Sequence, residues 1–219
     1  MTSAIRPIAV AVLVVLTVPQ FGGQAVPAKR RLNPTYNIID LGTLGGATST
    51  ALGVNDKGQV VGSADTPQGL RHAYLWENGV MTDLGTLGFP TAQSDAWDIN
   101  NQGVVVGIVG SGDPNRLFIW ENGVQTEIGP PQVLKSASGI NDAKQVVGIY
   151  IVPPIGDQHA FLWENGAMTD LGTLGGTYSI AWDINQNGQV AGGSSTSGVP
   201  GGAFLWQSGV MTYLAFAHK

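Results

Sequence analysis

Short apolar runs, separated by polar turns, recur along this chain. The first four of them are Ser49–Asn55, Gln59–Ala64, Arg71–Trp76 and Val80–Leu84, and each has the length of a β-strand. The links after the first and third runs are rich in Asn, Asp and Gly, the residues that accept positive φ in tight turns. Asn-Gly, the dipeptide most typical of a two-residue hairpin, follows the third run at Asn78. The pattern predicts an antiparallel four-stranded unit.

Apolar side chains occupy both faces of the predicted strands. In the third run Ala73 and Leu75 alternate with Tyr74 and Trp76, whereas a sheet with one wet face would alternate apolar and polar residues. Each unit must therefore be covered on both sides by its neighbours. Four-stranded antiparallel units that pack face to face are the blades of a β-propeller. A β-helix is the main alternative, but its rungs are shorter, and the hairpins require antiparallel pairing.

The four-stranded unit repeats with a period of 43 or 44 residues. One tryptophan in the third strand of every unit marks the repeat, with spacings of 44, 43 and 43 residues, and an asparagine after the first strand keeps the same period. We therefore predict an all-β, β-propeller-like array of four four-stranded antiparallel blades that fills residues 43–215. The markers are Trp76, Trp120, Trp163 and Trp206, and Asn55, Asn100, Asn141 and Asn185.

The residues in front of the first unit leave the closure of the ring open. Tyr36–Leu41 reads as a fourth strand without the rest of its unit. It either pairs with the last unit and latches the ring, competing with or adding to Val210–Phe216, or it leaves an open arc whose ends need a second chain. The oligomeric state is open for the same reason.

Composition and charge narrow the class of protein. The 219 residues suffice for one sizeable domain, and a charged fraction of 11% with 32 glycines suits a turn-rich β-array. The net charge of −5 argues against a nucleic-acid surface. Because the chain has no cysteine, it forms neither disulfides nor thiolate metal sites. No cofactor-binding motif is present, so we predict no cofactor and no metal.

The amino-terminal residues have the layout of a secretory signal peptide. Arg6 precedes an apolar run, Ile8–Val18, that is too short to span a bilayer. Ala25 and Ala28 offer two cleavage points, and an uncleaved anchor flanked by Lys29–Arg31 is the alternative. We predict a signal peptide over residues 1–25, a linker over 26–35 and one repeat domain over 36–219, in a secreted protein without membrane contact after cleavage.

Several sequence blocks recur together and in order. His-Ala-Phe stands before a Leu-Trp hairpin at His159, as His-Ala-Tyr at His72, and in weaker form at Gly202 and Arg116; Asp-Leu-Gly-Thr-Leu-Gly follows at Asp170. In these blocks residues 36–215 resemble the HAF-repeat family of extracellular proteins. The resemblance implies a secreted, mostly bacterial repeat protein of no established activity.

Residues that recur in every unit are most simply explained as scaffold. We expect the hairpin tryptophans to pack within or between blades, and the aspartates of the Asp-Leu-Gly blocks to bond to backbone amides of the following turn. We expect the histidine ring nitrogens to bond to backbone, with a ligand-binding pair as the less favoured alternative. These structural residues are Trp76, Trp120, Trp163, Trp206, Asp40, Asp83, Asp170, His72 and His159.

Two features are candidates for binding. The links between second and third strands vary freely on one side of the array, and variable loops on a rigid frame are where binding usually resides. In addition, Trp-Asp stands in the first strands of the second and fourth units, where the other units have Leu-Gly or Ser-Gly. The alternation either packs large residues against small ones or presents an aromatic platform and a carboxylate to a sugar. The predicted ligand-binding residues are Trp97, Asp98, Trp182, Asp183, Asp113 and Asp157.

These features favour a non-enzymatic module that binds an unknown glycan or protein, with no catalytic residues. The alternative is a secreted glycan-active hydrolase or lyase that uses Asp98 and Asp183 as a carboxylate pair, which requires about 5 to 10 Å between the two carboxyl groups. Calcium binding in the Asn-Asp turns is disfavoured because Asp56 and Asp142 stand nearly alone there, and calcium takes six or more oxygen ligands.

Overall fold

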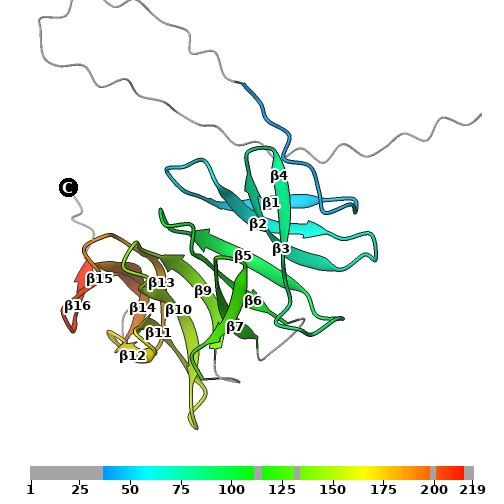
Figure 1. Cartoon of the computed structure of the whole chain (residues 1–219). Helices are drawn as coiled ribbons and strands as arrows, with labels where there is room; N and C mark the ends of the chain where they lie inside the picture. Colours follow the sequence, from blue (N-terminus) through cyan, green and yellow to red (C-terminus); the bar gives the residue numbers. More distant parts are fainter. Residues whose placement is uncertain (1–36, 111–114, 131–133, 198–200, 215–219) are drawn as a thin grey trace, which may run out of the picture.

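The computed structural model describes residues 37–110, 115–130, 134–197 and 201–214. The regular secondary structure of these residues consists of β-strands, which form four antiparallel four-stranded units in chain order (Figure 1). A parallel pair, Gln158 opposite Tyr178, joins the third and fourth units into one eight-stranded sheet. The predicted β-propeller-like array of four blades is therefore confirmed. The predicted signal peptide and linker, residues 1–35, lie outside the described residues.

Each unit contains four consecutive strands. The first unit is β1 (Ser49–Val54), β2 (Val60–Asp65), β3 (Arg71–Glu77) and β4 (Val80–Gly85). The second unit is β5 (Ser94–Ile99), β6 (Val105–Val109), β7 (Arg116–Glu121) and β8 (Val124–Ile128). The third unit is β9 (Leu134–Ile140), β10 (Val146–Val152), β11 (Asp157–Glu164) and β12 (Ala167–Gly172). The fourth unit is β13 (Gly175–Ile184), β14 (Val190–Thr196), β15 (Gly202–Gln207) and β16 (Val210–Leu214).

The hairpin between the third and fourth strands has the geometry that its sequence predicts. Asn78 and Gly79 have φ angles of 51° and 84°, which a type I′ turn requires at both central positions. The turn sets a register in which Glu77 lies opposite Val80 and Trp76 opposite Met81. Because Asn-Gly or Ser-Gly recurs at this point, the other three hairpins have the same backbone.

Hydrophobic side chains from consecutive units meet face to face. Between the first and second units, Val61 and Leu75 pack with Ile99 and Phe118, and equivalent clusters join the second unit to the third and the third to the fourth. These clusters form the core of the molecule, because both faces of the sheets are apolar.

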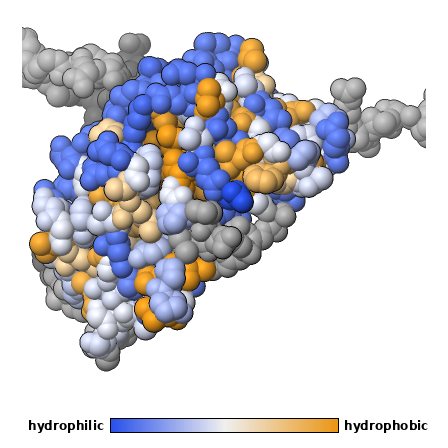
Figure 2. Space-filling model, turned by 60° about the horizontal axis from the view of Figure 1, so that its bottom comes forward, coloured by the Kyte–Doolittle hydropathy of each residue, from blue (hydrophilic) through white to orange (hydrophobic). Residues whose placement is uncertain are grey.

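The four units form an open arc (Figure 1). Among the described residues no hydrophobic cluster joins the fourth unit to the first. Ile99, which the preceding unit covers, is 4% exposed, whereas Val54 at the same position of the first unit is 47% exposed. Similarly, Leu171 is 6% exposed and Leu214, at the same position of the fourth unit, is 45% exposed. Each end of the arc therefore keeps exposed apolar side chains, and Figure 2 shows hydrophobic side chains at the molecular surface among hydrophilic ones.

The strand predicted over Tyr36–Leu41 is absent from the part of that segment that the structure describes. Residues 37–41 form no strand and do not pair with the last unit. Leu41 packs instead on Val60 of the first unit. The physical reason is that β16 already occupies the fourth-strand position of the last unit, where Tyr213 pairs with Phe204.

Candidate functional site

The aspartates of the Asp-Leu-Gly blocks bond to the turn that follows them, as predicted. A carboxylate oxygen accepts the amide hydrogen two residues later: Gly42 to Asp40 at 2.9 Å, Gly85 to Asp83 at 2.8 Å, and Gly172 to Asp170 at 2.8 Å. These side chains are therefore part of the repeat scaffold. Trp76, Trp120, Trp163 and Trp206 pack against the clusters of buried residues, in agreement with their predicted role.

The histidine prediction was wrong in its partner. The Nδ1 atom of His72 lies 2.8 Å from a carboxylate oxygen of Asp83, and that of His159 lies 2.9 Å from Asp170. Each histidine therefore pairs with the side chain that caps the turn, and not with backbone. The cross-strand pairing of the third and fourth strands brings the two side chains together, so the histidine–aspartate pair ties the hairpin to the turn.

Asp98 links the second unit to the third. Its carboxylate accepts the backbone amide hydrogens of Ile99 at 2.8 Å and of Ile140, in the next unit, at 2.9 Å. Burial raises the pKa of Asp98, and the negative charge of Asp183 raises it further, whereas the two amide bonds lower it. The desolvation of the charged carboxylate outweighs the two amide bonds, so the pKa of Asp98 lies above the ordinary value of 3.8.

We expect Asp98→Asn to change how stability depends on pH. A carboxyl group whose pKa is raised on folding stabilises the native state while it is protonated, and this contribution is lost as pH rises from about 3.8 through the raised value. The free energy of unfolding of the unmodified chain, measured with urea between pH 4 and 7, should therefore fall relative to that of the variant as pH rises. A difference that stays constant over this range would contradict the assignment.

The alternation of Trp-Asp with small residues places aspartates opposite glycines. A Cβ atom added to Gly53 would lie 3.0 Å from the Cα atom of Asp98, and one added to Gly139 would lie 3.3 Å from a carboxylate oxygen of Asp183. Glycine in the first and third units thus makes room for the aspartate of the following unit. Packing against glycine therefore explains both aspartates. It does not explain Trp97 and Trp182, which are 37% and 58% exposed and stay candidates for binding.

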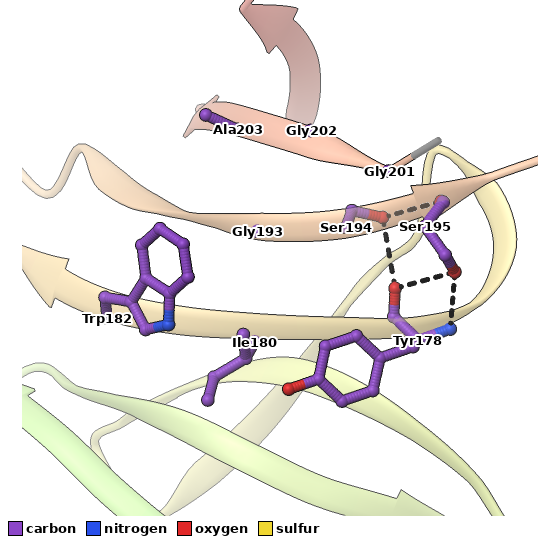
Figure 3. A pocket seen from close by; sticks show the side chains of 9 residues that line it. All are labelled: Tyr178, Ile180, Trp182, Gly193, Ser194, Ser195, Gly201, Gly202 and Ala203. Carbon is purple, nitrogen blue, oxygen red and sulfur yellow. Dashed lines mark hydrogen bonds between the residues drawn. The ribbon is translucent and has the colours of Figure 1, made fainter. Parts of the chain in front are cut away.

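Trp182 lines a groove on the open face of the fourth unit (Figure 3). Tyr178, Ile180 and Trp182 project from β13, and Gly193 of β14 and Ala203 of β15 lie beside them. The groove has a volume of about 520 Å³, within the range of ligand sites. We call this surface the open groove; its full lining is Tyr178, Ile180, Trp182, Gly193, Ser194, Ser195, Gly201, Gly202 and Ala203.

Small residues give the open groove its shape. A Cβ atom at Gly193 would meet the six-membered ring of Trp182 at 3.2 Å, so glycine lets the indole lie against the sheet. The other units have Ser63, Ile108 and Ile149 at this position. The fourth unit therefore combines a larger side chain on its first strand with a smaller one on its second, and the result is an aromatic surface above a shallow floor.

The polar atoms of the open groove are largely bonded within the chain. The Ser195 hydroxyl accepts from the Tyr178 amide at 2.9 Å and donates to the Tyr178 carbonyl at 3.1 Å (Figure 3). The Ser194 hydroxyl accepts from the Leu174 amide at 2.9 Å. The groove therefore recognises a partner mainly through apolar and aromatic contact.

The remaining predicted binding residues lie elsewhere. Asp157 begins β11 and is not among the residues that line the open groove. Asp113 lies outside the described residues, as do parts of two of the four variable loops, so their predicted binding role stays a prediction. Sequence reasoning missed Tyr178, Ile180 and Gly193; the available signal was that glycine replaces a larger residue at one repeat position of the fourth unit only.

Within the described ranges, no three His, Asp or Glu side chains are grouped so that they could hold a metal ion. The same ranges contain no helical segment capable of crossing a membrane.

Comparison with known proteins identifies the fold. The chain is similar to TolB from Acinetobacter baumannii, with a TM-score of 0.55 and 12% identity over 74% of this chain and 42% of that one. It is also similar to acylaminoacyl peptidase from Pyrococcus horikoshii, with a TM-score of 0.52 and 17% identity over 77% of this chain and 27% of that one. The β-propeller domain of the trilobed protease from Pyrococcus furiosus matches with a TM-score of 0.49 and 18% identity over 68% of this chain and 47% of that one.

The first two likenesses show a β-propeller-like fold, and at such identities they show nothing further. The chain spans less than half the length of each of these structures. No family profile matches the sequence, and no curated protein matches it.

Proposed function

We propose that the protein is a secreted, non-enzymatic binding module that takes a glycan or protein partner on the open groove of its fourth unit. The observation that carries this proposal is the 58% exposure of Trp182 beside Tyr178, which is 41% exposed. Large aromatic side chains contribute most to binding when a partner covers them. The exposed aromatic side chains of the open groove are therefore best explained as a surface that a partner covers.

The sequence supports the secreted part of the proposal, and the contacts of Asp98 support the non-enzymatic part. The amino-terminal layout and the HAF-like blocks fit an exported repeat protein. Asp98, one member of the conceivable carboxylate pair, uses its carboxylate to hold backbone amides of two units. A carboxylate in that role has little freedom to transfer protons to a substrate, so binding without catalysis is the better supported function.

Trp182→Ala tests the proposal, with Trp97→Ala as the matched control on the equivalent position of the second unit. We expect Trp182→Ala to weaken binding at least tenfold, as for truncation of an aromatic hot spot, and Trp97→Ala to leave it unchanged. Binding of the unmodified chain and both variants to glycans would be measured on an array of polysaccharides. Analytical ultracentrifugation would measure the case in which the protein partner is another copy of the chain. Binding that is equally strong in the unmodified chain and Trp182→Ala would contradict the proposed site.

A further inference from the structure

A ladder of hydrogen bonds connects the four units at their first turns. The side-chain amide of Asn55 donates to the carbonyl of Asn100 at 2.9 Å, Asn100 donates to Asn141 at 3.0 Å, and Asn141 donates to Asn185 at 3.1 Å. Every junction thus uses the same donor and the same acceptor. This asparagine ladder accompanies the apolar contact between units and fixes their relative position.

A second set of bonds follows the ladder one residue later. The backbone amide of Asp56 donates to the side chain of Asn101 at 3.0 Å, that of Asn101 to Asp142 at 2.8 Å, and that of Asp142 to Gln186 at 2.9 Å. All these bonds run from one unit to the next along the chain. In these two sets the donor lies on the earlier unit and the acceptor on the later one, whereas the Asn101 side chain and the Ile140 amide donate back to Asp56 and Asp98 of the preceding unit.

Both ends of the ladder are incomplete within the part of the chain that the structure describes. At the last unit, the Asn185 side-chain amide donates only to Gln189, at 2.7 Å, and the backbone amide of Gln186 has no bonding partner. At the first unit, the Asn55 carbonyl accepts only from Gly58 of its own turn, and one carboxylate oxygen of Asp56 has no partner. The last unit thus carries the donors, and the first unit the acceptors, of one more junction.

The two ends also expose apolar side chains at positions that the internal junctions bury. In the internal junctions a later unit covers the face that in the fourth unit carries the open groove. The last residue of the first strand is buried by the preceding unit in the second, third and fourth units. These residues are Ile99, Ile140 and Ile184, and they are 4%, 6% and 6% exposed. The first unit has Val54 there, and Val54 is 47% exposed because no unit covers it among the described residues. The fourth unit exposes 58% of Trp182 on the face that a later unit would cover.

We propose that a second copy of this chain is the partner of the open groove, with its first unit packed on the fourth unit of the first copy. This inference rests on the proposed function and specifies its protein partner. The contact repeats the internal junction, with Asn185 donating to the Asn55 carbonyl of the second copy and the Gln186 amide donating to its Asp56. It is a heterologous contact, which closes into a ring of copies or continues as a filament. Two copies would supply eight units, a number at which propellers close.

One strand end must give way in this contact. Leu41 already fills the position on the first unit that Leu214 of the other copy would reach, because Leu41 and Leu214 hold the same place in the repeat. Leu214 is the last residue of β16 and pairs only with Ala203. Displacing this one pair at a strand end is a small cost compared with covering two apolar faces.

Single cysteines test both the contact and its direction, since the chain has no cysteine of its own. Asp56→Cys and Gln186→Cys variants of the full chain are oxidised separately and as an equimolar mixture. We expect a disulfide-linked pair in the mixture, in at least tenfold excess over either variant alone. The internal control is the double variant Asp56→Cys/Asn101→Cys, because these side chains touch at 2.9 Å within one chain and should cross-link intramolecularly. Equal cross-linking of one variant with itself would overturn the head-to-tail arrangement.

Light scattering of the full chain gives an independent reading. We expect a mass of two or more copies at about 100 μM, and at least a tenfold weaker association for Trp182→Arg and for Val54→Asp, both of which change side chains exposed in the single chain. Circular dichroism verifies that the variants are folded. A monomer at all concentrations overturns the inference. If that monomer binds a polysaccharide through Trp182, the proposed function survives; if it binds nothing, both fail.

Discussion

Replacing Phe161 with alanine should lower the free energy of unfolding by about 3 to 5 kcal/mol, the usual cost of truncating a buried phenylalanine. Phe161 is 1% exposed and lies in the cluster that joins the second and third units. Its ring packs edge-on against Tyr150 at 6.5 Å between centroids. Gly148 provides the space, because a Cβ atom there would lie 2.9 Å from the Phe161 ring. Loss of the ring opens a cavity that the rigid sheets cannot fill.

Urea unfolding followed by circular dichroism measures this effect, with Phe89→Ala as the matched control. Phe89 is 43% exposed, and the guanidinium carbon of Arg116 lies above its ring, 4.9 Å from the ring centroid. We expect the control to cost about 1 kcal/mol or less, the magnitude of an exposed cation–π contact. If Phe161→Ala were as mild as the control, the junction between the second and third units would not be the core described above.

Asn100→Ala should destabilise the chain by about 3 kcal/mol, because it leaves several buried backbone groups without partners. Asn100 is 3% exposed, and its side-chain oxygen accepts from the amides of Gln102 at 3.0 Å and Val104 at 2.9 Å. Its side-chain amide donates to the carbonyl of Asn141 in the next unit at 3.0 Å. The substitution therefore opens both a turn and one rung of the asparagine ladder.

Asn185→Ala is the control for this prediction. Asn185 makes the same two turn bonds, from Asn187 and Gln189 at 3.0 Å each, but it is exposed and no later unit covers it among the described residues. Water replaces its lost bonds, so we expect a cost of about 1 kcal/mol when both variants are unfolded in urea at dilutions that keep the chain monomeric. Equal costs for the two substitutions would show that the ladder adds nothing at an internal junction.

The fold could be predicted because its signals are local and occur four times. Asn78-Gly79 dictates a type I′ hairpin wherever it stands, and apolar residues on both faces require neighbouring units. The predicted strands of the first unit agree with the observed ones to within one residue at each end. Repetition turned a weak single-strand signal into a reliable one, because the same boundaries had to fit every unit.

The histidine partner could not be predicted because it depends on strand register. His72 and Asp83, like His159 and Asp170, are eleven residues apart. Whether they meet is decided by the irregular register between Ala73 and Tyr74, which shifts the end of the pairing. No residue pattern specifies a bulge of that kind, so the backbone remained the expected partner.

The open groove could not be predicted from the sequence for a different reason. Trp182 was a candidate because of its sequence, but its exposure depends on whether a unit follows β16. Ring closure depends on the small rotation between successive units, which accumulates over the whole arc. The sequence predicts the contacts at each junction, but it does not predict the total rotation over the four units.

Distances between spin labels at the first turns test the open arc most directly. Labels would be attached to cysteines introduced at Asp56 and Asn101, and in a second sample at Asp56 and Gln186, with excess unlabelled chain to suppress distances between copies. The open arc predicts a short distance for the first pair, whose side chains touch at 2.9 Å, and a clearly longer one for the second. Equal short distances for both pairs would mean a closed four-bladed ring and would contradict the account.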